Sequence, residues 1–152
     1  MTPTSHMIAS AVTSAAFAAA THSWEGTLAC FLSGILIDID HHFDLWIHRK
    51  KILFQLKHIY DFCEKEKNGK FYLVFHSYEL LAIFWMGVIF LHLNNIWWGM
   101  AVGLSVHLLL DQIGNNLKPG TYFLWYRIKN NFSKESVFPA GHFQRTNRNI
   151  FR

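Results

Sequence analysis

The 152-residue chain has little charge for its length. Asp, Glu, Lys and Arg together make up 16% of its residues, whereas hydrophobic residues make up 51%. A soluble globular domain contains about 25% charged residues. Six Trp and fourteen Phe add to the apolar character of the chain. The shortage of charge argues against an ordinary soluble domain and favours a chain that is partly surrounded by lipid.

Cysteine is also scarce, and several catalytic motifs are absent from the sequence. The two cysteines, Cys30 and Cys63, form no CxxC pair, which argues against a zinc ribbon and against a disulfide framework. The sequence contains no P-loop, no GxSxG nucleophile elbow and no internal repeat. No Lys or Arg precedes the first apolar stretch, so we expect no cleaved secretory signal.

The basic residues that are present fall into two blocks. Lys and Arg occur only within residues 49–70 and 118–152, and they are missing from residues 1–48 and 71–117. Positive charge near helix ends marks the cytoplasmic side of membrane proteins. We therefore expect both blocks, and both ends of the chain, on the cytoplasmic face of a membrane.

The two regions without basic residues contain four apolar segments that we predict to be helices. They cover residues 6–20, 27–41, 71–93 and 96–113. A helix needs about 20 apolar residues to cross a bilayer, a length that the third segment meets and the fourth nearly meets. The first two are short enough to be buried helices of a soluble protein instead. The predicted fold is all-α, a membrane-embedded bundle of about four helices.

Ionisable residues occur at the expected cytoplasmic ends of all four helices. An ionisable side chain inside a bilayer costs about 2.5–3.5 kcal/mol, so it normally has a partner or a function. Helical spacing places His107 beside Asp111, and it predicts that His76 shares a helix face with Glu79. The full set that we expect to converge is His6, Asp38, Asp40, His41, His76, Glu79, His107 and Asp111.

A mixed set of imidazoles and carboxylates is typical of a metal site. Such ligands suit zinc, and also manganese or iron. Eight ligands are too many for one tetrahedral ion, so the set suits a two-metal cluster. A structural polar network without metal is the alternative. We interpret His42, Asp44 and His48 as outer support or exposed residues, and we place His22 and His92 at the opposite end of the bundle.

The chain outside the helices divides into a basic loop and a basic tail. Residues 48–70 form a partly amphipathic segment that we predict to be an interfacial helical loop. Its positive charges either mark topology alone or attract anionic lipid headgroups. No groove-reading motif accompanies them, so we expect no nucleic-acid partner. We accordingly predict a membrane-embedded metal-binding domain over residues 1–128 and a polar tail over residues 129–152.

Four short motifs, in order, resemble those of a known family. They are "SH" (Ser5–His6), "IDIDH" (Ile37–His41), "FHS" (Phe75–Ser77) and "HLLLD" (His107–Asp111). This pattern resembles the LexA-binding, inner-membrane-associated metal-dependent hydrolase family, whose motifs are similar to those of zinc-dependent phospholipase C. The resemblance covers residues 5–116 and departs from the family where Ile37 replaces a Pro and Phe75 replaces a Thr.

The resemblance implies a bacterial inner-membrane location and a metal-dependent hydrolase. The ligands that it implies are His6, Asp40, His76, His107 and Asp111, with Asp38 and His41 close by. We therefore expect a metal-activated water to cleave a phosphoester, such as a lipid, at the cytoplasmic face. In this hypothesis the metal ligands are His6, Asp38, Asp40, His76, His107 and Asp111.

Residues other than the metal ligands also have predicted roles. Glu79 or His41 would act as general base, and Arg49 and Lys50 would hold the phosphate. The alternative is a non-catalytic membrane protein with a structural metal site and a basic tail that binds a partner. A third hypothesis, a metal transporter, would need ligands spread through the membrane rather than gathered at one face.

Overall fold

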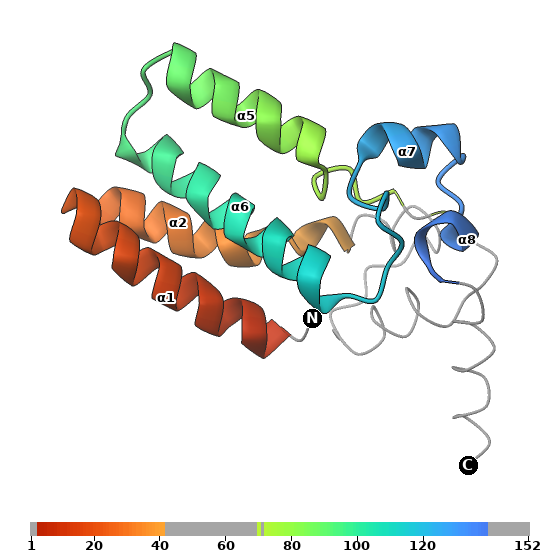
Figure 1. Cartoon of the computed structure of the whole chain (residues 1–152). Helices are drawn as coiled ribbons and strands as arrows, with labels where there is room; N and C mark the ends of the chain where they lie inside the picture. Colours follow the sequence, from red (N-terminus) through yellow and green to blue (C-terminus); the bar gives the residue numbers. More distant parts are fainter. Residues whose placement is uncertain (1–2, 42–69, 71, 140–152) are drawn as a thin grey trace. The chain divides into compact units, whose positions relative to one another are not determined.

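A computed structural model describes residues 3–41, residue 70 and residues 72–139 (Figure 1). These residues are mostly helical and include no strand, which confirms the all-α prediction. The chain divides into two compact units. One comprises Met1–Ile37 and Phe75–Asn115, and the other comprises Asp38–Val74 and Asn116–Arg152.

The first unit contains the four helices that the apolar segments predict. They are α1 (Pro3–Thr21), α2 (Trp24–Leu36), α5 (Tyr78–Phe90) and α6 (Asn95–Gly114). Helix α6 packs against each of the other three, and α1 also packs against α2. In Figure 1, α6 lies between α5 and the pair formed by α1 and α2. Helix α6 is therefore the central element of this unit.

Local sequence explains where these helices begin and end. Helix α1 is rich in Ala, the residue with the highest helix propensity. The side chains of Ser23 and Asn94 cap α2 and α6 by accepting hydrogen bonds from the amides of Gly26 and Ile96. His22 and His92, with φ of 52° and 49°, turn the chain after α1 and after α5. Both histidines therefore lie at the end of the unit remote from His6.

Helix α2 and helix α6 approach each other through small residues. A Cβ atom at Gly99 would collide with the carbonyl oxygen of Gly26, and one at Gly103 would collide with that of Cys30. Between the same helices, the Ser33 hydroxyl donates to the carbonyl of Met100 at 3.2 Å. The two backbones are thus in direct contact, as in the small-residue helix interfaces typical of membrane proteins.

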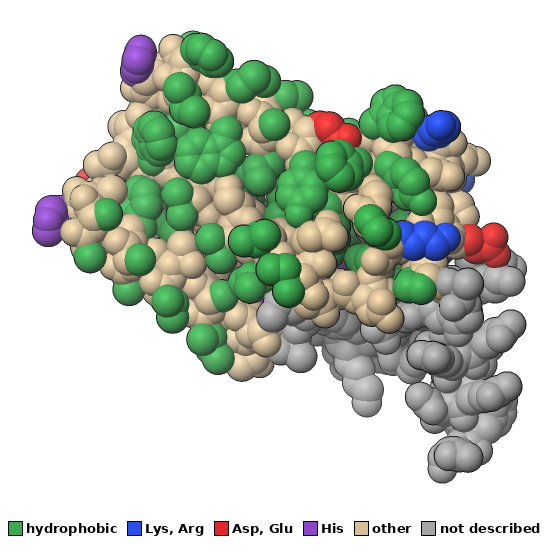
Figure 2. All heavy atoms as spheres, viewed as in Figure 1, with side chains coloured by type: hydrophobic (Ala, Val, Ile, Leu, Met, Phe, Trp, Pro, Cys, Tyr) green, Lys and Arg blue, Asp and Glu red, His purple; other side chains and the backbone are tan. Residues whose placement is uncertain are grey.

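The first unit buries several small polar side chains and exposes many large apolar ones. Ser10, Ser14 and Ser33 are buried, whereas many large apolar side chains are exposed on all four helices. Figure 2 shows hydrophobic side chains spread over one face of this unit. The exposed set includes Met7, Ile8, Val12, Leu28, Leu32, Leu36, Ile83, Met86, Ile89, Phe90, Leu109 and Ile113.

Among its described residues, the second unit includes the short helices α7 (Leu124–Lys129) and α8 (Lys134–Val137). The buried Arg127 donates from Nη1 to the carbonyl oxygens of Tyr72, at 2.7 Å, and Leu73. The amide of Lys118 donates to the carbonyl of Val137 at 2.9 Å. These bonds connect the segment before α5 and the segment after α6 to the two short helices.

Two predicted helices are longer than the helices observed. The prediction of a helix over 71–93 is wrong at its start, because Leu73 has a φ of 34° and Ser77 is extended, so α5 begins at Tyr78. His76 therefore precedes the helix and does not share a helix face with Glu79. Helix α2 ends at Leu36, before the acidic residues that follow it.

Insertion of the chain into a membrane stays a prediction. Among the described residues, α6 alone is long and apolar enough to cross a bilayer. The basic loop over 48–70 lies outside the described residues except for Lys70, as do His42, Asp44, His48, Arg49 and Lys50. The same holds for residues 140–152 of the predicted tail.

The close contact between α2 and α6 generates a prediction about two glycines. Replacing Gly103 by Leu should destabilise the protein by about 3 kcal/mol, because the backbones must separate to admit the side chain. Gly87→Ala is the matched control: nothing lies within 4 Å of a Cβ at that helical position, so stability should rise by roughly 0.5–1 kcal/mol. Thermal unfolding of the purified variants measures both effects, and equal stability of the two would contradict the packing described.

Candidate metal centre

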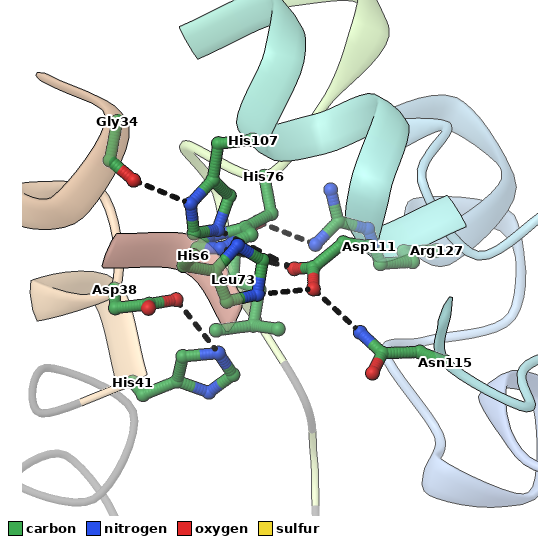
Figure 3. Close-up of polar contacts among 10 residues, drawn as sticks. All are labelled: His6, Gly34, Asp38, His41, Leu73, His76, His107, Asp111, Asn115 and Arg127. Atoms are coloured by element: carbon green, nitrogen blue, oxygen red, sulfur yellow. Dashed lines mark hydrogen bonds and ion pairs between the residues drawn. The ribbon is translucent and has the colours of Figure 1, made fainter. Parts of the chain in front are cut away.

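Three histidines and one aspartate of the first unit gather around a single point (Figure 3). His6 comes from the first turn of α1, and His76 comes from the loop before α5. His107 and Asp111 lie one turn apart on α6. All four side chains are at most 7% exposed. Three separate parts of the chain therefore bring ionisable groups into one buried cluster, which we call the His–Asp cluster.

The carboxylate of Asp111 is the shared partner within the His–Asp cluster. Its Oδ1 lies 3.0 Å from Nε2 of His6. Its Oδ2 lies 3.5 Å from Nε2 of His107 and 3.8 Å from Nε2 of His76. The rings also touch: His6 stacks on His107 with centroids 4.1 Å apart, and His76 meets His107 edge-on at 5.4 Å.

A backbone carbonyl fixes the orientation of His107. Nδ1 of His107 lies 2.8 Å from the carbonyl oxygen of Gly34. A carbonyl can only accept, so Nδ1 carries the proton, and a neutral imidazole then directs the lone pair of Nε2 toward Asp111. Histidines that bind metals are usually held in this way, with one ring nitrogen on an outer acceptor and the other on the ion.

An amide fixes the orientation of Asp111. Nδ2 of Asn115 donates to Oδ1 of Asp111 at 2.8 Å, and the backbone amide of Asn115 donates to the carbonyl of Asp111 at 3.0 Å. Asn115 follows the last residue of α6, so it caps the helix and holds the carboxylate at the same time. The carboxylate therefore has one oxygen held by Asn115 and the other facing His76 and His107.

The charge and spacing of the His–Asp cluster fit a divalent cation. A buried carboxylate is costly unless a positive charge compensates it. Two ligands about 2.1 Å from a tetrahedral zinc ion lie about 3.4 Å apart. The separations of 3.5 and 3.8 Å between Oδ2 of Asp111 and the two imidazoles are close to that value. These groups are thus spaced as ligands of one ion.

The ligand atoms available within the first unit come from three residues. Those of His76, His107 and Asp111 all lie within 4.8 Å of one another. Asp38, which follows Ile37, belongs to the second unit, so its role as a ligand stays a prediction. The three residues of the first unit could hold a metal ion, whereas the predicted identity and number of the ions stay predictions.

The other predicted site residues stay predictions. Asp40 is buried and follows Asp38, and Nε2 of His41 lies 3.9 Å from Oδ1 of Asp38. Glu79 is half-buried in the first turn of α5. Arg49 and Lys50 lie outside the described residues. The sequence analysis does not predict a role for Asn115. Its position four residues after Asp111, on the same helix face, is the sequence feature that indicates contact between the two side chains.

The geometry predicts that metal binding depends on Asp111. Asp111→Ala removes the one carboxylate that all three imidazoles of the cluster face, so bound divalent metal per chain should fall at least tenfold. Elemental analysis of protein purified in detergent measures this content. Glu25→Ala removes an exposed acid from the first turn of α2 and should leave the content unchanged. Full metal content in the Asp111 variant would exclude this cluster as the metal site.

Comparison with known proteins identifies no relative of this chain, so the role of the His–Asp cluster is inferred from its geometry. No family model, curated protein or solved structure matches the chain. The resemblance to the inner-membrane-associated hydrolases therefore continues to rest on the four sequence motifs alone. What the structure adds is the position of three motif residues, His6, His76 and His107, around Asp111.

Proposed function

We propose that the protein is a membrane-bound, metal-dependent hydrolase that cleaves a phosphoester. The observation that carries this proposal is the spacing of His76, His107 and Oδ2 of Asp111, which suits ligands of one ion. The hydrogen bond from His107 to Gly34 supports it, because it presents the second ring nitrogen as a ligand. A bound divalent ion would polarise a phosphoryl oxygen and lower the pKa of a water molecule.

The residues of the chain would contribute binding, orientation and proton transfer. His76, His107 and Asp111 would hold the ion, and Gly34 and Asn115 would keep two of these ligands in position. Glu79 or His41 would accept the proton of the attacking water. Arg49 and Lys50, which directly follow His48 in the sequence, would attract the anionic phosphate.

The distribution of side chains in the first unit supports the membrane part of the proposal. Serines and glycines are buried between its helices, while large apolar side chains are exposed on its surface. The 19 residues of α1 and the 20 residues of α6 correspond to lengths of about 28 and 30 Å, close to the thickness of the hydrocarbon core. Trp24, Trp97 and Trp98 are exposed in the first turns of α2 and α6, beside polar turns, as interfacial aromatics are.

A lysine on the exposed face of α5 tests membrane insertion. Ile83 is 58% exposed near the middle of this helix. In a bilayer, Ile83→Lys should reduce insertion and yield in the membrane fraction, because a central lysine costs about 2.5–3.5 kcal/mol. Ile83→Leu is the control and should behave as wild type. If the lysine variant accumulates normally and is released from membranes by alkaline carbonate, the chain does not lie in lipid.

The alternative, a structural metal site, is favoured by one observation. The four side chains of the His–Asp cluster are almost completely buried, and structural metal sites are closed to solvent whereas catalytic ones keep a position open. In that case the ion would join α6 to the loop before α5 and would not act on a substrate. Removal of the metal would then lower the melting temperature without abolishing any activity.

Hydrolysis by the metal-loaded protein separates the two functions. Wild type in detergent or nanodiscs, loaded with Zn²⁺ or Mn²⁺, should hydrolyse at least one member of a panel of phosphomonoesters, phosphodiesters and phospholipids. His107→Ala should lower kcat/KM at least a hundredfold because it removes a ligand, and a chelator should abolish activity. A metal-loaded wild type that cleaves no substrate of the panel, yet melts at a lower temperature after chelation, would support the structural role instead.

A further inference from the structure

The two oxygens of Asp111 have different surroundings. Oδ1 receives the amide of Asn115 at 2.8 Å and lies 3.0 Å from Nε2 of His6. Oδ2 lies farther from its neighbours, at 3.5 Å from Nε2 of His107 and 3.8 Å from Nε2 of His76. One oxygen is thus surrounded at hydrogen-bonding distance, and the other faces two imidazoles at a longer distance.

The distances to Oδ1 and Oδ2 indicate which neighbours of Asp111 are hydrogen-bond donors and which are spaced as metal ligands. N–H···O hydrogen bonds have donor–acceptor distances of about 2.7–3.2 Å, which includes both contacts to Oδ1. Ligands of one tetrahedral ion lie about 3.4 Å apart, which is close to both contacts to Oδ2. The residues of the first unit whose ligand atoms are grouped within 4.8 Å of one another are likewise His76, His107 and Asp111, and His6 is not among them.

We propose that His6 is a positioning residue and not a metal ligand. Together with Asn115, it donates to Oδ1 of Asp111 and thereby directs Oδ2 toward the ion held by His76 and His107. This inference rests on the proposed metal site and changes the role that the sequence predicts for His6. Stacking of the His6 ring on His107 at 4.1 Å means that the same side chain also fixes the plane of a ligand.

A glutamine at position 6 distinguishes the two roles. The side-chain amide of Gln can replace Nε2–H of His6 as a donor to Asp111, but an amide is a poor ligand for Co²⁺ or Zn²⁺. If His6 positions Asp111, His6→Gln should retain Co²⁺ affinity within about threefold, whereas His6→Ala should lose about 10–100-fold. His107→Gln, which replaces a ligand, should lose at least a hundredfold.

Asn115 provides an independent variant with a matched control. Asn115→Ala removes the amide on Oδ1 and should lower Co²⁺ affinity by about 10–100-fold. Asn94→Ala removes the side-chain cap at the other end of the same helix, so it has a similar effect on helix stability and should leave the affinity unchanged. Circular dichroism of each variant in detergent verifies that its helices are retained.

Co²⁺ titration monitored by the visible absorption of the bound ion is the measurement. It gives the affinity, the number of ions and, from band position and intensity, the coordination. An unchanged spectrum and stoichiometry in His6→Gln would support the positioning role. A loss as large as in His107→Gln, or the loss of one ion of two, would show that His6 is a ligand. If wild type binds no Co²⁺ or Zn²⁺, the metal site itself is wrong, and the proposed function fails with it.

Discussion

The first unit depends on the compensation of one buried negative charge, the carboxylate of Asp111. Moving a carboxylate out of water costs free energy, and interactions with the surrounding groups must replace the lost hydration energy. Here the compensation comes from Asn115, from His6 and, in our proposal, from a divalent cation that His76 and His107 help to hold. Because these groups belong to different helices and to the loop before α5, the need to surround one carboxylate also determines which parts of the chain must meet.

Helix packing makes this meeting possible. Glycines at 99 and 103 let the backbone of α6 lie directly against that of α2, and His107 follows on the same helix one turn after Gly103. At this short separation the carbonyl of Gly34 comes within hydrogen-bonding distance of the His107 ring. Small residues therefore serve two purposes, close packing of the helices and alignment of a candidate ligand.

The sequence predicts the helices well and the cluster in part. Gaps in the charge pattern indicate all four helices of the first unit, and the four-residue spacing correctly places His107 beside Asp111. The position of His76 before α5 could not be predicted, because it follows from a left-handed backbone at Leu73, a residue type that gives no signal for it. The role of Gly34 was also inaccessible, since a carbonyl oxygen is common to every residue.

The distribution of the cluster along the chain has a consequence for biosynthesis. His6 lies in the first turn of α1, and Asp111 lies in the last turn of α6, so the ribosome makes the two partners at the beginning and near the end of this unit. Until residue 111 has been synthesised, the imidazole of His6 has no Asp111 carboxylate to contact. Assembly of the cluster is therefore late in the synthesis of the first unit, and binding of the ion would require that all four helices of that unit have been made and packed together.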